Sequence, residues 1–459
     1  MHQPTNFDAV IIGAGPAGSA AAILLARAGW AVALVERQPF PRRKVCGECI
    51  AASNMPLLAA LGLGGALQAG AGFELRQVTL LRGASEFSAR LHPAVDTDHP
   101  WGLALDRQRL DALLLDKARE SGAEVMQPWS LQAMAGQAGA WQCEVRSAST
   151  GQSLVLHSVV LIDAHGSWEP LPVQRKYATR HIVRRAPHQP SDLFGFKAHF
   201  TGASHRPGEI SLLALDGGYG SMVVADGGVT TVACCIRRDR LDVLRRDSGG
   251  QSAGAAVQDW LQRECAGVQR VLATGTRDGS WLSVGPIRPG VRVGEHNKLF
   301  RIGNAAGEAH PILGEGISMA LQSAALLCSN LLGRRLLSAA AEDLDQADVL
   351  RAYVADWKRA FTPRRHMAAA FAHSAMRPRV SGVLMSLVRA CPGLLTQSGR
   401  WGGKVELPLL SSPPATLRWL TPGLTREGTA LPARPFAASV LDRPRPVSPR
   451  PAPGNEPPP

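Results

Sequence analysis

Two glycine-rich segments, far apart in the chain, contain the residues best suited to hold a phosphate-bearing ligand. The first follows an apolar run and reads Gly13-Ala-Gly-Pro-Ala-Gly18, so that Pro16 and Ala17 open a helix. Gly13 permits a tight turn, Gly15 lets the backbone approach a pyrophosphate, and Gly18 lets the helix lie close on the strand. The pattern predicts the first turn of a dinucleotide-binding fold.

A second apolar run supports this interpretation. It spans Ala31–Val35 and ends at Glu36, which is followed by Arg37. An acid at this distance from the glycines is expected to accept the ribose hydroxyls of a dinucleotide. We therefore interpret Glu36 as a ribose ligand rather than as one half of a surface salt bridge.

The second glycine-rich segment lies much later in the chain. Leu299–Ile302 has the composition of a short buried strand, Gly303–Gly316 is a glycine-rich turn, and Ile317–Leu332 is an apolar run of helix formers. Within the turn, Gly314 and Gly316 let the backbone come close to a ligand. A helix N-terminus behind such a loop attracts negative charge, which a pyrophosphate or a reduced flavin ring supplies. Together the two segments predict an FAD site.

The composition is that of a folded globular protein. The 459 residues are 45% hydrophobic, enough for one large or two ordinary cores. The formal net charge is +13, but the basic residues are scattered and only 5% of residues are aromatic. We therefore expect no nucleic-acid partner. We attribute the excess of arginine to codon usage or to attraction of acidic cofactors and anionic membrane surfaces.

The longest apolar run does not reach membrane-spanning length without interruption. Ile317–Leu332 contains Gln322, Ser323 and Asn330. The apolar stretch near the N-terminus contains the glycine motif and lacks a basic leader. We expect a cytoplasmic protein that can be peripheral to the inner face of a membrane.

The cysteines do not suggest a disulfide framework, because the chain is long and the eight cysteines are widely spaced. Cys46-Gly47-Glu48-Cys49 could be a dithiol redox centre or half of a zinc site. No second pair with ligand spacing follows, so we expect no metal. A catalytic dithiol is the less favoured interpretation.

Changes of pattern divide the chain into five parts. An α/β, Rossmann-type FAD-binding domain of three-layer ββα architecture is predicted in two parts, with an antiparallel-sheet substrate domain inserted between them. Short segments of period two separated by Asp-Gly turns are typical of such a sheet. The predicted bounds are 1–175 and 281–335 for the FAD-binding domain, 176–280 for the substrate domain, 336–400 for C-terminal helices and 401–459 for a disordered, proline-rich tail. A basic patch is expected on the helices, at Lys358, Arg359, Arg364, Arg365, Arg377 and Arg379.

These motifs, in this order, resemble the flavoprotein aromatic hydroxylase and geranylgeranyl reductase superfamily over roughly residues 7 to 400. Arg107 matches the arginine that leads the family's second helix and reaches toward the flavin. Asp163-Ala-His-Gly-Ser resembles the family's Ala-Asp-Gly-Ser motif, with His165 in place of the aspartate. Gly303-Asn-Ala-Ala-Gly resembles its Gly-Asp motif, with Asn304 replacing the aspartate that holds the ribityl chain. The loops 41–49 and 306–317 resemble the geranylgeranyl reductase branch more than simple phenol hydroxylases.

The departures from the family pattern can be weighed physically. Asn304 keeps an acceptor oxygen but loses the charge of a carboxylate, so weaker FAD binding by about 1 kcal/mol is expected. We interpret His165 as a loop histidine with satisfied hydrogen bonds, the alternative being an altered contact with NADPH. The halogenase branch of the family would need a Trp-x-Trp-x-Ile-Pro element and an active-site lysine. Gly218-Tyr-Gly-Ser-Met-Val-Val stands where that element would fall and lacks both tryptophans, which argues against halogenation.

The resemblance implies an FAD-dependent oxidoreductase, with an NAD(P)H-dependent monooxygenase acting on a hydrophobic small molecule as the favoured activity. Hydride from NAD(P)H would reduce the flavin, and oxygen would react at the ring edge near Pro311. The competing hypotheses are reduction of isoprenoid double bonds, with Cys46 beside the flavin, and a flavin-binding protein without turnover. His199, Tyr219 and His310 are polar candidates on the substrate side, and none is assigned as an acid or base.

The predicted cofactor site gathers residues from both glycine-rich segments and from the loop and helix between them. It comprises Gly13, Gly15, Pro16, Ala17, Gly18, Glu36, Arg37, Cys46, Gly47, Arg107, Gly303, Asn304, Pro311, Gly314, Gly316 and Ile317.

Overall fold

The computed structural model describes most of the chain up to residue 396. The described residues are 5–69, 72–94, 99–166, 171, 187–294, 299–335, 345–391 and 393–396. The described residues all belong to one compact unit, Met1–Leu424. The predicted tail, 401–459, lies outside the described residues, as does the Ser167 end of the motif that begins at Asp163.

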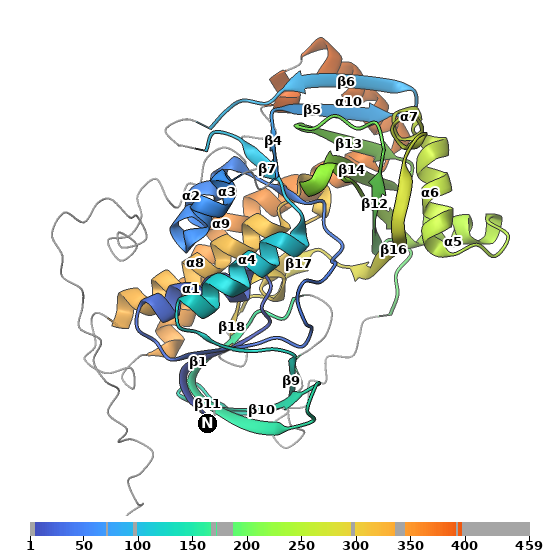
Figure 1. Cartoon of the computed structure of the whole chain (residues 1–459). Helices are drawn as coiled ribbons and strands as arrows, with labels where there is room; N and C mark the ends of the chain where they lie inside the picture. The colour runs from blue at the N-terminus through green and yellow to red at the C-terminus, as the bar shows by residue number, and fades with distance from the viewer. Residues whose placement is uncertain are drawn as a thin grey trace, which may run out of the picture. The chain divides into compact units, whose positions relative to one another are not determined.

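A mixed sheet carries the first glycine-rich turn (Figure 1). Its strands run in the order β8-β2-β1-β11-β10-β9, and β18 pairs with β11. The pairs that join β8, β2, β1, β11 and β18 are parallel, whereas β10 and β9 extend the sheet antiparallel. The bounds are β1 Asn6–Ile12, β2 Val32–Val35, β8 Glu124–Met126, β9 Trp129–Gln137, β10 Ala140–Ser147, β11 Ser153–Asp163 and β18 Phe300–Arg301. The Rossmann-type fold predicted from the sequence is confirmed.

Four helices from distant parts of the chain form one hydrophobic core with one face of this sheet. They are α1 (Pro16–Arg27), α4 (Arg107–Glu120), α8 (Gly316–Arg335) and α9 (Gln346–Ala375). Gly18 shows how closely α1 lies on the turn, because a Cβ there would come within 1.8 Å of the Gly13 carbonyl oxygen. Among the described residues, α8 is long and apolar enough to cross a membrane by composition, but 72% of its Gly316–Gly333 stretch is buried inside the fold.

Capping residues set the limits of α4. The Asp106 carboxylate accepts a hydrogen bond from the Gln108 backbone N–H at 2.8 Å, which satisfies one of the free donors at the start of the helix. Gly122, with φ +96°, follows its end. Local residues therefore set both ends of α4.

The second sheet is larger than the range 176–280 predicted. Its strands run in the order β16-β12-β15-β14-β13-β5-β6. The hairpins β13–β14 and β14–β15 form as their period-two pattern predicted, but β5 and β6 come from within the predicted first part of the FAD-binding domain, and β5 pairs with β13 in parallel. That pairing joins distant segments, so it leaves no local signal in the sequence. The bounds are β5 Gln77–Arg82, β6 Ser85–Arg90, β12 Leu193–Thr201, β13 Glu209–Leu215, β14 Gly218–Val224, β15 Thr230–Arg237 and β16 Thr276–Ile287.

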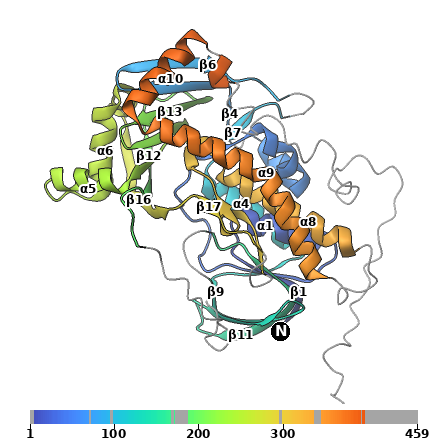
Figure 2. The same ribbon diagram turned by 180° about the vertical axis from the view of Figure 1, so that it is seen from behind.

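Further helices cover this second sheet. α5, α6 and α7 pack on it and share its core, although the sequence pattern predicted only strands there. α10 contacts β5 and β6 (Figure 2). The remaining bounds are α2 Met55–Leu58, α3 Gly64–Gln68, α5 Arg238–Asp247, α6 Ala253–Glu264, α7 Ala266–Leu272, α10 Pro378–Ala390, β3 Cys49–Ile50, β4 Phe73–Leu75, β7 Gly102–Ala104, β17 Gly290–Val291 and β19 Gly307–Glu308.

A buried ionic cluster joins the Cys46–Cys49 loop to the second sheet. The Glu48 side chain is fully buried and accepts hydrogen bonds from the Lys197 ammonium on β12 and the Thr231 hydroxyl on β15. The Arg107 backbone N–H donates to Glu48 Oε1 at 3.3 Å. Burial alone would raise the pKa of Glu48, but bonds from His199, Lys197 and Thr231 and the Lys197 charge outweigh it and lower the pKa to about 2.

We predict that Lys197→Met destabilises the fold strongly, because it leaves the Glu48 carboxylate buried without its cation. The free energy of unfolding should fall by about 3–5 kcal/mol in urea denaturation at neutral pH. Lys358→Met, which changes an exposed lysine, should have little effect. The double variant Glu48→Gln/Lys197→Met should recover much of the loss, and equal stability of the two lysine variants would contradict the assignment.

The pH dependence of the same cluster follows from its lowered pKa. A carboxyl whose pKa is lowered on folding contributes stability above its unfolded value, and loses it as the pH falls through the folded value. The stability due to Glu48 should therefore be complete above about pH 4.5 and disappear towards pH 2.

Candidate cofactor and substrate site

A cavity of about 1020 Å³ contains the predicted site. With the exception of Gly18, every residue predicted to bind the cofactor lines it. Gly18 lies behind the turn, where it fits the helix against the strand. The cavity therefore unites two segments that are separated by most of the chain.

The glycines of the two turns leave room for a ligand. A Cβ at Gly15 would meet only Arg107 Nη2, at 3.8 Å, and a Cβ at Gly316 would meet nothing within 4 Å. Gly13 has φ +103°, and a Cβ there would lie 2.6 Å from the Ala164 carbonyl oxygen, so it is fixed by the fold. No side chain of a described residue caps α1. The N-termini of α1 and α8 both border the cavity, and backbone N–H groups in such a position suit a pyrophosphate and an anionic ring.

Glu36 is buried at the edge of this cradle. Its carboxylate accepts hydrogen bonds from the backbone N–H groups of Ala14, at 3.0 Å, and Gln38, at 2.9 Å. It also forms an ion pair with Arg42 at 2.8 Å. Glu36 is thus in a salt bridge, but a buried one beside the glycine turn. Its role as a ribose ligand stays a prediction.

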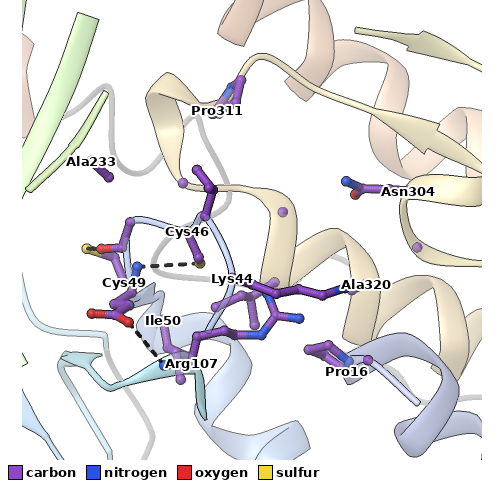
Figure 3. A pocket seen from close by; sticks show the side chains of 18 of the residues that line it. Pro16, Lys44, Cys46, Cys49, Ile50, Arg107, Ala233, Asn304, Pro311 and Ala320 are labelled. Atoms are coloured by element: carbon purple, nitrogen blue, oxygen red, sulfur yellow. Dashed lines mark hydrogen bonds between the residues drawn. The ribbon is translucent and has the colours of Figure 1, made fainter. Parts of the chain in front are cut away.

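Cationic side chains surround the cradle (Figure 3). Arg107 forms an ion pair with Asp111 at 2.6 Å, and its guanidinium lies beside the Cys46 thiol. Lys44 extends along the cavity toward Ala320. Burial, followed by the charges of Arg42 and Arg107, lowers the pKa of Lys44 to about 8. An anionic ligand would offset this repulsion.

Asn304 is oriented by a neighbouring carboxylate. Its side-chain amide donates to Glu308 Oε1 at 3.2 Å, and its side chain points into the cavity (Figure 3). Arg292 donates to Glu308 Oε2 at 3.3 Å and to the Asn304 carbonyl oxygen at 3.1 Å. The side chain of Asn304 thus serves as a donor to a buried acid. Glu308 itself lines the cavity.

The far part of the cavity is apolar. Strands β5, β13, β14, β15 and β16 and the loop that contains Pro311 contribute its lining. Its apolar residues include Val78, Ile210, Leu212, Ala233, Leu282, Val284, Ile287, Ile312 and Leu313. Such a surface fits a hydrophobic molecule.

Tyr219 is the buried phenol in this apolar region. It is 2% exposed, and its hydroxyl has no nitrogen or oxygen partner among the described residues. Burial, with Cys235 and Glu308 nearby, raises its pKa well above the ordinary value. Tyr219 is therefore a protonated donor at neutral pH.

The histidine candidates have other surroundings. His165 lines the cavity, and its Nδ1 bonds to Asp163, as expected for a loop histidine. His199 belongs to the Glu48 cluster, with Nε2 3.6 Å from Glu48 Oε1. His310 packs on His373 with ring centroids 5.3 Å apart. Neither His199 nor His310 lines the cavity.

The predicted basic patch on the C-terminal helices is not continuous. Arg364 is buried, where it bonds to Glu315 and to Gln322. Arg365 donates to the Glu308 carbonyl oxygen at 3.3 Å. These two arginines turn inward because they hold the loop before α8, so only the remaining basic residues face solvent.

The described cysteines are free thiols. Cys46 Sγ accepts from the Glu48 backbone N–H at 3.5 Å, and Cys49 Sγ donates to the Gly47 carbonyl oxygen at 3.2 Å. In the described part of the chain no group of three or more His, Cys, Asp or Glu side chains could hold a metal ion.

The sequence of residues 6–181 matches the family model described as FAD binding domain. The chain therefore contains an FAD-binding domain. The glycine cradle, the two open helix N-termini and the surrounding cations fit this cofactor. The individual contacts to FAD stay predictions.

Proteins similar to this chain include halogenases, and one structure with a similar fold is described as a probable monooxygenase. A tryptophan 2-halogenase of Chondromyces crocatus is 31% identical over 171 residues, which are 36% of this chain and 31% of the relative. The myxobacterial chondrochloren halogenase CndH superposes with a TM-score of 0.69 at 20% identity, covering 86% of this chain and 93% of its own. PqsL of Pseudomonas aeruginosa, described as a probable FAD-dependent monooxygenase, superposes with a TM-score of 0.62 at 20% identity, covering 83% and 99%. These structures share the fold of the chain. The chain spans less than two thirds of the length of the curated relatives it matches.

The sequence motifs did not predict Lys44 or Glu308 as residues of the site. Lys44 lies in a basic loop, where no spacing rule distinguishes it from its neighbours. Glu308 lies four residues after Asn304, and this closeness to the substituted motif is the one sequence feature that could have indicated its role in the site.

The contacts of Asn304 give a prediction for FAD affinity. Restoring the family's aspartate with Asn304→Asp should weaken FAD binding about tenfold, because two carboxylates would then face each other beside the cavity. Glu308→Gln in the same chain should restore the affinity, since the glutamine can donate to the new aspartate. Flavin fluorescence titration of the single and double variants measures the coupling. Tighter FAD binding by Asn304→Asp alone would contradict this account.

Proposed function

We propose that the protein is an FAD-dependent monooxygenase that oxidises a lipophilic small molecule, with NAD(P)H as the electron donor. The observation that carries the proposal is the continuity of one cavity, from the glycine cradle to the apolar face of the second sheet. A dinucleotide and an apolar molecule would share one continuous space there. A cytoplasmic location and the absence of a nucleic-acid partner belong to the same proposal.

Bound FAD would supply electron transfer and oxygen activation. The protein's part is to position the groups and to exclude water. The N-terminus of α8 offers backbone donors for negative charge, and Gly314, with φ +61°, shapes the loop before it. Arg364 bonds to both Glu315 and Gln322, so this loop is held against α8 and α9 from inside. The apolar lining keeps water from the substrate side.

Tyr219 would orient the substrate. A buried donor without a strong partner is costly, and a ligand that accepts from it removes that cost. The adjacent Cys235 thiol is only a weak partner. We therefore propose a substrate that is mostly apolar and carries one hydroxyl or carbonyl acceptor.

Halogenation is the second candidate function, because the relatives and the similar structures include halogenases. A halogenase of this family would need a lysine on the substrate side. Among the described residues, Lys44 is the lysine that lines the cavity, and it lies in the cationic part beside Arg42 and Arg107. This placement favours oxygenation over halogenation.

Double-bond reduction would use the same cavity and the same cofactor. The position of Cys46 in the cavity, beside Arg107, is the feature that favours reduction. Reduction differs from oxygenation because it needs no oxygen, and flavin binding without turnover differs from both because it gives no product.

The decisive experiment is turnover by the FAD-loaded protein with NAD(P)H and a panel of lipophilic phenols, quinones and polyprenyl compounds. Mass spectrometry should show gain of one oxygen atom that comes from labelled O₂, and bromide should not change the product. Gly15→Val, which fills the cradle, should abolish the reaction as a control. A brominated product would establish halogenation, and anaerobic gain of two hydrogens would establish reduction. No product under any condition would leave a binding protein and overturn the proposal.

We predict that Tyr219→Phe raises the KM for an acceptor-bearing substrate about tenfold, the loss expected for one hydrogen bond to a buried donor. The affinity for FAD should not change. Tyr353→Phe is the matched control, because the Tyr353 hydroxyl donates to the Arg301 carbonyl oxygen at 2.7 Å and does not line the cavity. That control should lower stability and leave KM unaltered. The same KM in wild type and Tyr219→Phe would exclude Tyr219 as a substrate contact.

A further inference from the structure

Helix α10 carries an apolar stripe on its outer face. Val380, Val383 and Leu387 are 39%, 62% and 48% exposed, and their spacing of three and four places them on one side of the helix. Leu394, just beyond the helix, is 44% exposed. Elsewhere in the described chain, Val155 and Val291 are the large hydrophobic residues that are exposed to this degree. The exposed apolar surface is thus concentrated at this helix.

The stripe cannot turn inward, because the opposite face of α10 is fixed. Ser381, Met385 and Val388 are buried beneath the helix, which contacts β5 and β6 (Figure 2). Arg82 on β5 donates to Ser381 Oγ at 2.9 Å and to the Pro378 carbonyl oxygen at 2.7 Å. The outer stripe is therefore a permanent feature of the surface.

The stripe is bordered by positive charge. α10 contains Arg379 and Arg389, both exposed, and no acidic residue. Arg377 precedes it and is also exposed. The acids near its start are paired, since Asp239 bonds to Arg237 and Asp216 lies 3.9 Å from Arg240.

We propose that α10 docks on the surface of an anionic lipid bilayer. An amphipathic helix with an aliphatic stripe and flanking arginines matches the chemistry of the headgroup and acyl boundary. The arginines would attract anionic headgroups while the stripe enters the acyl region. A protein partner is less well matched, because the helix offers no aromatic residue, the type that dominates protein–protein contacts.

The position of the helix links this surface to the cavity. Leu395 and Thr396, a few residues beyond α10, line the cavity. A bilayer held against α10 and Leu394 would lie close to this part of the lining. A lipophilic substrate could then pass from the bilayer to the cavity, and this last step rests on the proposed function.

Vesicle cosedimentation of the full-length protein tests the docking without any turnover. Vesicles of phosphatidylcholine with phosphatidylglycerol should bind the protein, and vesicles of phosphatidylcholine alone should bind it much more weakly. Val383→Glu/Leu387→Glu should lower the binding at least about tenfold, since two side chains that enter the acyl region on docking would become charged. Arg379→Gln and Arg389→Gln should each lower it about fivefold. Val155→Glu is the matched control and should bind like wild type.

Three outcomes would overturn the proposal. The first is equal binding of the double glutamate variant and the Val155→Glu control. The second is no preference for the anionic vesicles. The third is a larger elution volume of the double glutamate variant in the absence of vesicles, which would make the stripe a contact between copies of the chain. Turnover of a substrate solubilised in detergent does not depend on these outcomes. Failure of the docking can therefore be distinguished from failure of the proposed function.

Discussion

The buried carboxylate of Glu48 holds together the parts of the molecule that enclose the cavity. It belongs to the loop that carries Cys46, yet its donors lie on two neighbouring strands of the second sheet and at the start of α4. An unpaired charge in the interior is costly, so the loop, the sheet and the helix must keep one relative arrangement. This constraint fixes the geometry of the cavity wall.

Chemical character changes along the cavity in a way that suits two unlike molecules. Open backbone N–H groups and the side chains of Arg42, Lys44 and Arg107 gather at one end, where charge would be neutralised. Aliphatic side chains from the second sheet form the other end. Asn304 and Glu308 lie on the wall, where the Asn304 amide donates to the Glu308 carboxylate and Arg292 holds that carboxylate and the Asn304 carbonyl oxygen.

The sequence predicted those features that depend on local spacing. The glycine turns and the hairpins of the second sheet have short-range patterns, and the structure contains them. Pairing between distant segments was not predicted, as with β5 and β13, or Lys197 and Glu48, which are 149 residues apart. The role of Asn304 depends on whether its side-chain amide donates or accepts. Its contact with Glu308, which makes it a donor, is seen only in the structure.

The origin of the second sheet constrains how such a protein can diversify. β5 and β6 lie within the FAD-binding part of the sequence, but they pair in a sheet whose other strands come much later. The substrate wall is therefore not one contiguous stretch of sequence. Recombination could not exchange it as a single block without leaving two strands behind. New specificities would instead arise by point substitutions on the faces of β13, β14 and β15, with the cradle and its ionic links retained.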